Sequence, residues 1–249
     1  MRIVKPGYEL ISEISSFGIW ELMDIEKAAR TCYRSEDKIL DQAESAKKMV
    51  KKLIESGHEA MLEHSSLSVL FTCDRAIANE LVRHRVASFA QESTRYCNYS
   101  KDKFGNELSF IKPFTLKDGS PEYGLWVSSC YADEEYYMKM LNAGVTPEIA
   151  RSVLPLCLAT KIVVTANYRE WRHIFKLRTA KDAHPQMREL LIPLLKDLKE
   201  RIPVIFDDIK VEEFPNWEDK LHRELEKAIL YGLPNTHQDE LAEGKYEDH

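Results

Sequence analysis

Residues 65–96, SSLSVLFTCDRAIANELVRHRVASFAQESTRY, carry the clearest structural signals in the chain. Apolar and small polar side chains alternate over residues 65–73, and this period of two predicts a strand with one buried face. Asp74 follows as the expected N-cap of a helix that runs to about Arg85. The side chains expected in the core are Leu67, Val69, Phe71 and Cys73 from the strand and Ile77, Leu81 and Val82 from the helix. The segment therefore predicts a strand and a helix that bury their apolar faces.

A cluster of cationic and hydroxyl side chains occupies residues 83–96, with three arginines, one histidine and three serine or threonine residues. Guanidinium groups present rigid pairs of donors that fit phosphate and uracil-type oxygens, and crowded like charges repel unless an anion lies among them. A solvated helix end is the alternative, because cations are favourable at a helix C-terminus. The polar residues continue to Arg95 without a helical period, so we interpret the segment as a nucleotide site. Glu80, Arg83 and His84 would share one face of the predicted helix.

The other segments mix strand and helix patterns without an internal repeat. Strands are expected at residues 2–11, 109–114 and 159–167, and helices at residues 20–34, 44–56, 122–143, 168–177 and 182–201, with a short helix after Thr146. In the helix at 168–177, Trp171 and Phe175 are expected in the core. Arg169 and His173 lie four positions apart on its opposite face. This order of elements predicts a single α/β (α+β) domain.

Length and charge limit the class of protein. With 249 residues and 44% hydrophobic content, the chain can bury a substantial core, and we expect one domain over residues 1–232. Residues 233–249 form an acidic polar tail that we expect to be poorly ordered. A net charge of −6 argues against a surface that binds nucleic acid as a whole. No apolar run approaches the length of a membrane span, so we expect a soluble, cytoplasmic protein.

Cysteine and histidine positions give no sign of a disulfide scaffold or a metal site. The five cysteines, Cys32, Cys73, Cys97, Cys130 and Cys157, are scattered and never form a CxxC pair, which is typical of reduced thiols. None of them stands out as a nucleophile. His58 and His64 lie near Glu59 and Glu63, but their spacing is not HExxH, and solvated or capping roles fit them better. We predict no metal site.

Four motifs in a fixed order make the chain similar to one known family. They are Glu63-His64 before the alternating strand, RHR at 83–85 followed after seven residues by Ser93, ARSVLPLCLATK around Arg151, and NYREWRHIFKLR from Asn167 to Arg178 followed by AHPQMREL. Together they span roughly residues 58 to 190, which makes coincidence improbable. The chain resembles the flavin-dependent thymidylate synthases. The resemblance implies a mixed, largely antiparallel sheet flanked by helices.

The resemblance also implies a reaction. It is the reductive methylation of dUMP to dTMP, with 5,10-methylenetetrahydrofolate as the carbon donor, NADPH as the reductant and FAD as the redox cofactor. Such chemistry needs no enzymic cysteine, which fits the absence of a PCH-type motif. The family implies a homotetramer whose active sites are shared between subunits, so that Glu80, Arg83 and Arg151 would serve a neighbour's site. Neither a nucleic acid nor a membrane is an expected partner.

Site residues follow from the matching motif positions. Arg178 matches the catalytic arginine proposed to favour ionisation of the uracil ring at N3. The positions implied for dUMP are Glu80, Arg83, Gln91, Glu92, Ser93, Thr94, Arg95, Arg151 and Arg178. The positions implied for FAD are His64, Ser66, Arg83, His84, Arg85, Gln91, Asn167, Arg169 and His173.

Some positions depart from the family pattern. Glu80 stands where glutamine is frequent, and Ala90 and Gln91 stand where asparagine and glutamate are more usual. We hypothesise that the exchange between positions 80 and 91 keeps one carboxylate in the site. His173 replaces a more usual asparagine, and an imidazole ring can offer one donor or one acceptor to a flavin edge.

Two alternative functions remain open from the sequence. An RNA-binding or nucleotide-sensing module would use the same arginines for phosphate and would use Tyr96 and Tyr99 for stacking. That module gives no reason for the polar face of residues 168–177 or for Arg178. The other alternative is a different flavoprotein that acts on a pyrimidine nucleotide.

Overall fold

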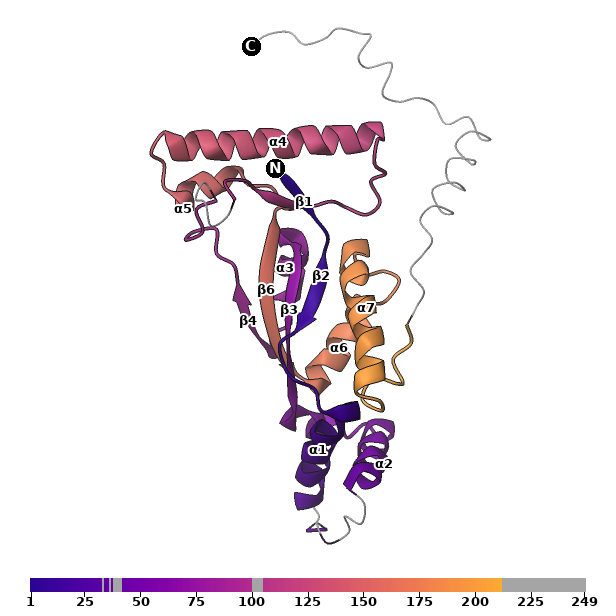
Figure 1. Cartoon of the computed structure of the whole chain (residues 1–249). Coiled ribbons are helices and arrows are strands. Elements are labelled where there is room, and N and C mark those ends of the chain that lie inside the picture. The colour runs from indigo at the N-terminus through magenta and orange to yellow at the C-terminus, as the bar shows by residue number, and fades with distance from the viewer. Residues whose placement is uncertain (33, 36, 38–41, 100–104, 212–249) are drawn as a thin grey trace, which may run out of the picture. The chain divides into compact units, whose positions relative to one another are not determined.

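A four-stranded antiparallel sheet organises the part of the chain that the structure describes (Figure 1). The structure is a computed structural model, and it describes residues 1–32, 34–35, 37, 42–99 and 105–211. The strand order is β2 (Gly7–Leu10), β3 (Ser66–Asp74), β6 (Ala159–Asn167) and β4 (Ala87–Gln91). Two further strands, β1 (Arg2–Val4) and β5 (Ser109–Ile111), form a separate parallel pair. The expected mixed, largely antiparallel sheet flanked by helices is confirmed.

Strands β3 and β6 pair along their whole length and set the two faces of the sheet. Val69 lies opposite Val164 and Phe71 opposite Ile162, and all four side chains are fully buried. On the other face Ser68 lies opposite Thr165, with their hydroxyl oxygens 2.8 Å apart. The alternation in the sequence therefore predicted the strand and its buried face correctly.

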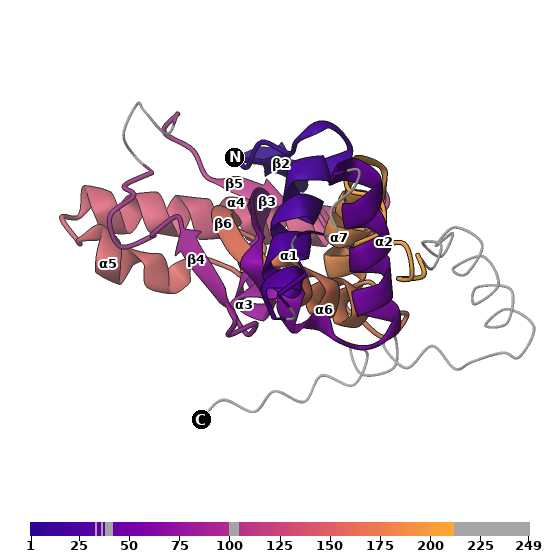
Figure 2. The ribbon, with the colours of Figure 1, turned by 90° about the horizontal axis from the view of Figure 1, so that it is seen from below.

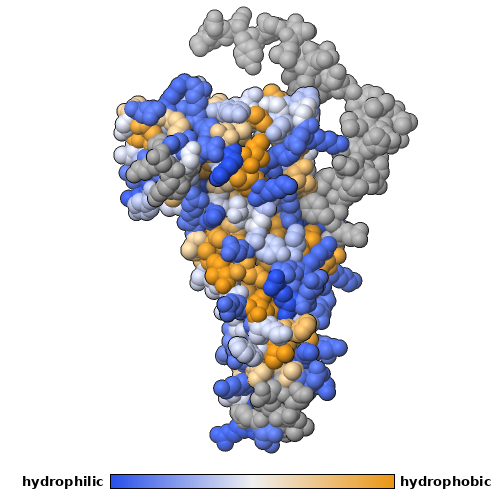
Figure 3. Space-filling model, in the orientation of Figure 1, coloured by the Kyte–Doolittle hydropathy of each residue, from blue (hydrophilic) through white to orange (hydrophobic). Residues whose placement is uncertain are grey.

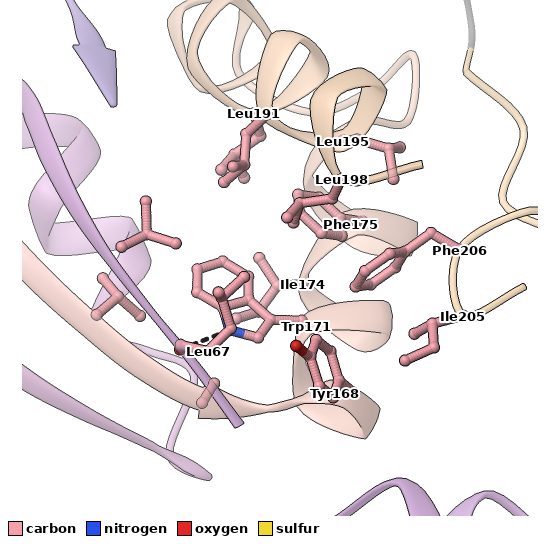
Figure 4. Close-up of a cluster of buried hydrophobic side chains, with 14 of the residues drawn as sticks. Leu67, Tyr168, Trp171, Ile174, Phe175, Leu191, Leu195, Leu198, Ile205 and Phe206 are labelled. Atoms are coloured by element: carbon pink, nitrogen blue, oxygen red, sulfur yellow. Dashed lines mark hydrogen bonds between the residues drawn. The ribbon is translucent and has the colours of Figure 1, made fainter. Parts of the chain in front are cut away.

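Helices α6 (Tyr168–Arg178) and α7 (Pro185–Arg201) cover the apolar face of the sheet (Figure 1). Trp171 and Phe175 are buried and stacked, with ring centroids 5.6 Å apart, as their spacing predicted. Trp171 donates its indole N–H to the carbonyl oxygen of Leu67 at 3.0 Å, which ties α6 to β3 (Figure 4). Figure 4 also shows side chains of α7 closing over this cluster. The position of α6 is thus fixed by its buried face.

Helices α1 (Ile19–Thr31) and α2 (Gln42–Glu55) pack side by side and extend the same core (Figures 1 and 2). A second buried cluster lies beside β5. It combines Phe110 with Cys130 and Tyr137 of α4 (Pro121–Asn142) and with residues around α5 (Pro147–Ala150). All these helices were predicted, with ends shifted by up to three residues. The strand expected at residues 2–11 is divided into β1 and β2.

The expected helix after Asp74 is shorter than predicted. Asp74 does cap α3 (Arg75–Leu81), since its carboxylate accepts the backbone N–H of Ile77 at 2.7 Å. The helix then ends because the N–H groups of Arg83 and His84 bond to carbonyls only three residues back. Val82 is consequently 41% exposed, so its expected place in the core is wrong. Glu80, Arg83 and His84 do not share a helix face, because the last two lie beyond the helix.

Strand β4 was not predicted. Its side chains alternate only between half-buried and exposed positions, and the sequence ASFAQ shows no clear alternation of apolar and polar residues such as marked β3. The strand is placed by its backbone pairing with β6, in which Phe89 lies opposite Val164. Sheet pairing, together with the packing of Ala87 and Phe89 against the core, therefore decides the conformation here.

Hydrophilic side chains cover much of the molecular face drawn in Figure 3, with apolar ones between them. Within the described residues, no helix is both long enough and apolar enough to cross a membrane. The boundary expected at residue 232 and the tail at 233–249 lie outside the described residues.

Candidate functional site

The guanidinium group of Arg178 is held by three hydrogen bonds at the end of α6. Its Nε donates to His84 Nε2 at 3.1 Å, its Nη1 to the Glu80 carboxylate at 2.8 Å, and its Nη2 to the Glu80 carbonyl at 3.2 Å. A guanidinium has five N–H donors, so two remain for a ligand. The Arg178 side chain is 22% exposed, so part of it reaches solvent. The contacts with His84 and Glu80 thus fix the orientation of the two remaining N–H groups.

His84 connects this arginine to the first turn of α6. The turn that ends α3 directs His84 inward, where it is 6% exposed. Its Nδ1 lies 3.2 Å from the Glu170 carboxylate. Burial and the charge of Arg178 lower the pKa of His84, and the hydrogen bond with Glu170 opposes that shift. The imidazole is therefore neutral at neutral pH.

A pocket of about 420 Å³ opens beside this cluster, within the size range of ligand sites. Its lining consists of Glu59, Glu63, Val86, Asn167, Arg169, Glu170, His173 and Lys176. Arg169 and His173 are both exposed, as predicted. Arg169 pairs with Glu63, and Lys176 lies 3.7 Å from Glu59. Three residues assigned to FAD from the resemblance, Asn167, Arg169 and His173, are thus brought together.

The residues around Ser93 form a second polar group at the other end of β4. The hydroxyl of Ser93 accepts the backbone N–H of Arg95 at 3.2 Å. Arg151 donates to the hydroxyl of Thr94 at 3.5 Å, and Arg95 pairs with Glu148 at 3.1 Å. Both arginine side chains reach the surface. This group carries exposed cations that an anion could approach.

Gln91 and Glu92 have their own partners. The amide of Gln91 donates to Thr160 at 3.4 Å, whereas Glu92 accepts the Tyr99 hydroxyl at 3.0 Å. Tyr99 is 7% exposed, and burial together with the Glu92 charge raises its pKa. A buried Tyr99 cannot stack on a base, whereas Tyr96 is 76% exposed, so the structure removes one of the two rings that an RNA-binding module would use. Glu92 and Tyr99 also line a pocket of about 560 Å³ next to β5.

The predicted site is divided within one chain. His84 precedes β4 and Ser93 follows it, and five residues of strand span roughly 13 Å. Glu80, His84 and Arg178 therefore gather at one end, while Ser93, Thr94, Arg95 and Arg151 gather at the other. The remaining residues assigned from the resemblance, His64, Ser66, Arg83 and Arg85, are exposed.

The sequence reasoning missed Glu170. It lies three residues after the N-cap Asn167, whose side chain accepts its backbone N–H at 2.8 Å, so it resembles an ordinary helix-start glutamate. His84, Glu170 and His173 offer ligand atoms within 4.8 Å of one another. Both ring nitrogens of His84 already have protein partners, so we assign no metal to this group.

Comparisons with known proteins identify the class and then the family. The fold resembles two structures of the UMP/dUMP methylase PolB from Streptomyces cacaoi. The structure with 5-Br dUMP has a TM-score of 0.67 and 24% identity, covering 83% of this chain and 96% of that chain. The structure with 5-Br UMP has a TM-score of 0.66 and 21% identity over 83% and 95%. At these identities the likeness establishes an α+β fold.

Sequence comparison gives the family. The family model described as "Thymidylate synthase complementing protein" matches residues 21–204. A flavin-dependent thymidylate synthase from Corynebacterium aurimucosum is 34% identical over 75% of this chain and 79% of its own length. Another from Pyrococcus furiosus is 31% identical over 79% and 73%. The chain belongs to this family, the flavin-dependent thymidylate synthases, and the resemblance seen in the sequence is confirmed.

Proposed function

We propose that the chain is a flavin-dependent thymidylate synthase that methylates carbon 5 of dUMP to give dTMP. Family membership supports the reaction, and the orientation of Arg178 is the observation that carries it in the structure. A guanidinium remains protonated at every working pH, so it can stabilise an imide anion at N3 of the pyrimidine. The two N–H groups that remain on Arg178 suit uracil deprotonated at N3, because N3 and the adjacent carbonyl oxygen then both accept hydrogen bonds.

The pocket beside α6 fits FAD in its chemistry. Arg169 and Lys176 would hold a diphosphate once they exchange their partners Glu63 and Glu59 for it, and Asn167 and His173 offer hydrogen-bonding groups. Arg85 is exposed and directly precedes the pocket residue Val86, so it adds a further cation. Bound flavin supplies the electrons that reduce the transferred one-carbon unit to a methyl group. We propose 5,10-methylenetetrahydrofolate as the source of that unit and NADPH as the source of the electrons.

The buried Cys73 is unsuited to bond covalently to the base. Cys73 is 1% exposed, and burial together with the nearby Asp74 charge raises the pKa of its thiol to about 12. Such a thiol is a poor nucleophile at neutral pH, because only the thiolate attacks. In the proposed reaction Arg178 activates the pyrimidine electrostatically, in place of a nucleophile that bonds to it.

We propose that neighbouring copies complete each active site in a homotetramer. A phosphate suits the hydroxyls and arginines of the group formed by Ser93, Thr94, Arg95 and Arg151, but that group lies at the far end of β4 from Arg178. A second copy would supply it, so Glu80 and Arg151 would come from different copies, unlike the expectation that both serve a neighbour's site. When Arg178→Ala subunits and Arg151→Ala subunits are mixed in equal amounts, some sites combine an intact Arg178 from one copy with an intact Arg151 from another. Activity should then return to about one quarter of the wild-type value. Recovery of no activity would exclude sharing.

The proposed function is tested with the pure protein and its four small molecules. Incubation with dUMP, methylenetetrahydrofolate, NADPH and FAD should give dTMP, and tritium should leave position 5 of labelled dUMP. The protein should also be yellow when it retains flavin. A colourless protein that binds dUMP without releasing tritium would contradict the proposal and favour a nucleotide-sensing module.

A further inference from the structure

Glu170, His84 and Arg178 form a buried chain of hydrogen bonds. The chain begins at the Glu170 carboxylate, which lies 3.2 Å from His84 Nδ1, and ends at Arg178 Nε, which lies 3.1 Å from His84 Nε2. The side chain of His84 is 5% exposed and that of Glu170 is 11% exposed. Water therefore competes little for these bonds. The two ends of helix α6 are connected through a residue from outside the helix.

The chemistry of the partners fixes the proton on His84. An arginine N–H can only donate, so Nε2 must accept and carries no proton. The ring proton must then lie on Nδ1, where the Glu170 carboxylate accepts it. A doubly protonated His84 would have no acceptor for Arg178 and would place a second cation against it. The charged and titratable groups that face His84 are Glu170, His173 and Arg178, and Glu80 reaches it through Arg178.

We propose that Glu170 is a positioning residue for Arg178, acting through His84. Glu170 accepts the Nδ1–H of His84 and so helps to select and orient the tautomer whose Nε2 holds the Arg178 guanidinium. Glu80 fixes the other two contacts. The two remaining N–H groups of Arg178 then point in a fixed direction. This inference rests on the proposed role of Arg178 in binding the pyrimidine.

The same two hydrogen bonds change the role expected for His84. The family resemblance implied that His84 holds FAD, but both of its ring nitrogens bond to protein groups. Its ring could contact flavin through a nitrogen only by releasing Glu170 or Arg178. His173 lies next to it, with ring centroids 5.8 Å apart, and is exposed on the pocket wall. Of the two histidines, His173 is the one whose ring faces the proposed flavin pocket.

The first test uses the protein without cofactor or substrate. Nitrogen-15 NMR of labelled histidine at neutral pH should show a protonated Nδ1 and an unprotonated Nε2 for His84. Replacement of Glu170 by leucine should weaken the preference for this tautomer, because Nδ1–H then loses its acceptor and only the Arg178 donor still favours it. A wild-type His84 with its proton on Nε2, or with both nitrogens protonated, would overturn the proposal regardless of activity.

The second test uses steady-state kinetics. Glu170→Gln should lower kcat by about tenfold, in line with the typical worth of a hydrogen bond to a charged group. The affinity for FAD is measured in parallel by absorbance titration, and kcat is compared at saturating FAD, because Glu170 also lines the proposed flavin pocket. Unchanged kcat in Glu170→Gln with the tautomer preference retained would contradict the proposal.

The pH dependence separates positioning from simple stabilisation. Protonation of His84 breaks its bond with Arg178, so activity falls as the pH decreases through the pKa of His84. Glu170 raises that pKa, and Glu170→Gln should therefore shift the acid limb of kcat to lower pH. Glu26→Gln is the matched control, since Glu26 is 1% exposed and pairs with Arg30 at 2.7 Å far from this group. It should lower stability and leave the acid limb unmoved. The proposal fails if the limb moves equally in both variants.

Conservative variants of His84 complete the test. Glutamine offers one acceptor and one donor, as the neutral imidazole does, whereas phenylalanine offers neither. His84→Gln should keep more activity than His84→Phe at equal flavin content. Equal activities of the two variants would contradict the positioning role. If the wild-type protein forms no dTMP, the proposed function itself has failed, and the NMR result still judges the hydrogen-bond chain.

Discussion

The two ends of β4 differ in how their arginines are held. At one end Arg178 is 22% exposed and three of its donors contact protein acceptors. At the other end Arg95 is 56% exposed, and its carboxylate partner Glu148 is 46% exposed. Exposed pairs of this kind contribute little, because water and salt screen them. The difference teaches that a single chain already orients Arg178, which is proposed to bind the pyrimidine. The residues proposed to bind the phosphate are left to be ordered by the ligand or by a neighbouring copy.

The largest effect is expected from Arg178→Ala. Loss of a pre-oriented electrostatic group costs about 10²- to 10³-fold in kcat, and the substitution also leaves Glu80 and His84 without their partner. The rate of dTMP formation measures the effect. Arg201→Ala serves as a control, because Arg201 is an exposed residue of α7 that pairs with Asp197 at 2.6 Å. Equal rates in the two variants would remove Arg178 from the mechanism.

A smaller effect is expected from Arg151→Ala, and it should appear in a different parameter. Arg151 contacts Thr94 at the exposed end, so its loss should raise the KM for dUMP by about tenfold and change kcat little. The KM increase should shrink at high salt, because screening already weakens the wild-type contact. A fall in kcat without a change in KM would show that the two ends do not differ in role.

Glu80→Gln tests the clamp on Arg178 and the hypothesis about positions 80 and 91. Glu80 bonds to Arg178 and Gln91 bonds to Thr160, so the two side chains have different partners in this chain. We expect the neutral amide to hold Arg178 less firmly and to change the affinity for dUMP by several-fold, about 1 kcal/mol. Calorimetry with dUMP measures it. An unchanged affinity would end the hypothesis that a carboxylate is kept in the site.

The buried side of the fold should also show a pH-dependent stability. Burial and the Asp74 charge raise the pKa of Glu189 from 4.5 to about 7. Its stabilising protonated form is therefore fully present below pH 4.5 and is lost as the pH rises through about 7. Glu189→Gln should flatten this decline in the free energy of unfolding, measured with urea. An equally steep decline in the variant would show that Glu189 is not the titrating group.

The smallest effect is expected from Glu148→Gln. Removing the partner of Arg95 should change the free energy of unfolding by less than about 1 kcal/mol, because both side chains are exposed. Thermal unfolding in low and high salt measures it. A larger loss would mean that the Ser93 end is as firmly ordered as the Arg178 end.

The sequence predicted the elements whose side chains alternate between a buried and an exposed environment. Strand β3 and helix α6 were placed within one residue, because Val69, Phe71, Trp171 and Phe175 carry clear periods. Strand β4 was missed, since its five residues alternate only between half-buried and exposed positions and its sequence shows no clear alternation of apolar and polar residues. The early end of α3 was missed as well, because no glycine or proline marks the chain after Leu81.

The candidate site was predictable only in part. Motif positions gave Arg178 and its neighbours in α6, since these residues lie close together in the sequence. The contact between His84 and Glu170 joins positions 86 residues apart, and the turn after α3 creates it. Such a pairing depends on tertiary structure, so no local pattern could reveal it. For the same reason the sequence could not show that β4 divides the arginine-rich segment.

Tritium release from position 5 of dUMP by the Arg178→Lys variant tests the central claim most directly. Lysine keeps the positive charge but lacks the planar pair of donors and the contact through Nε. We predict that the wild-type protein releases tritium and that the lysine variant, with normal flavin content, releases it at least about a hundredfold more slowly. Release at the wild-type rate would contradict the view that an oriented guanidinium activates the pyrimidine.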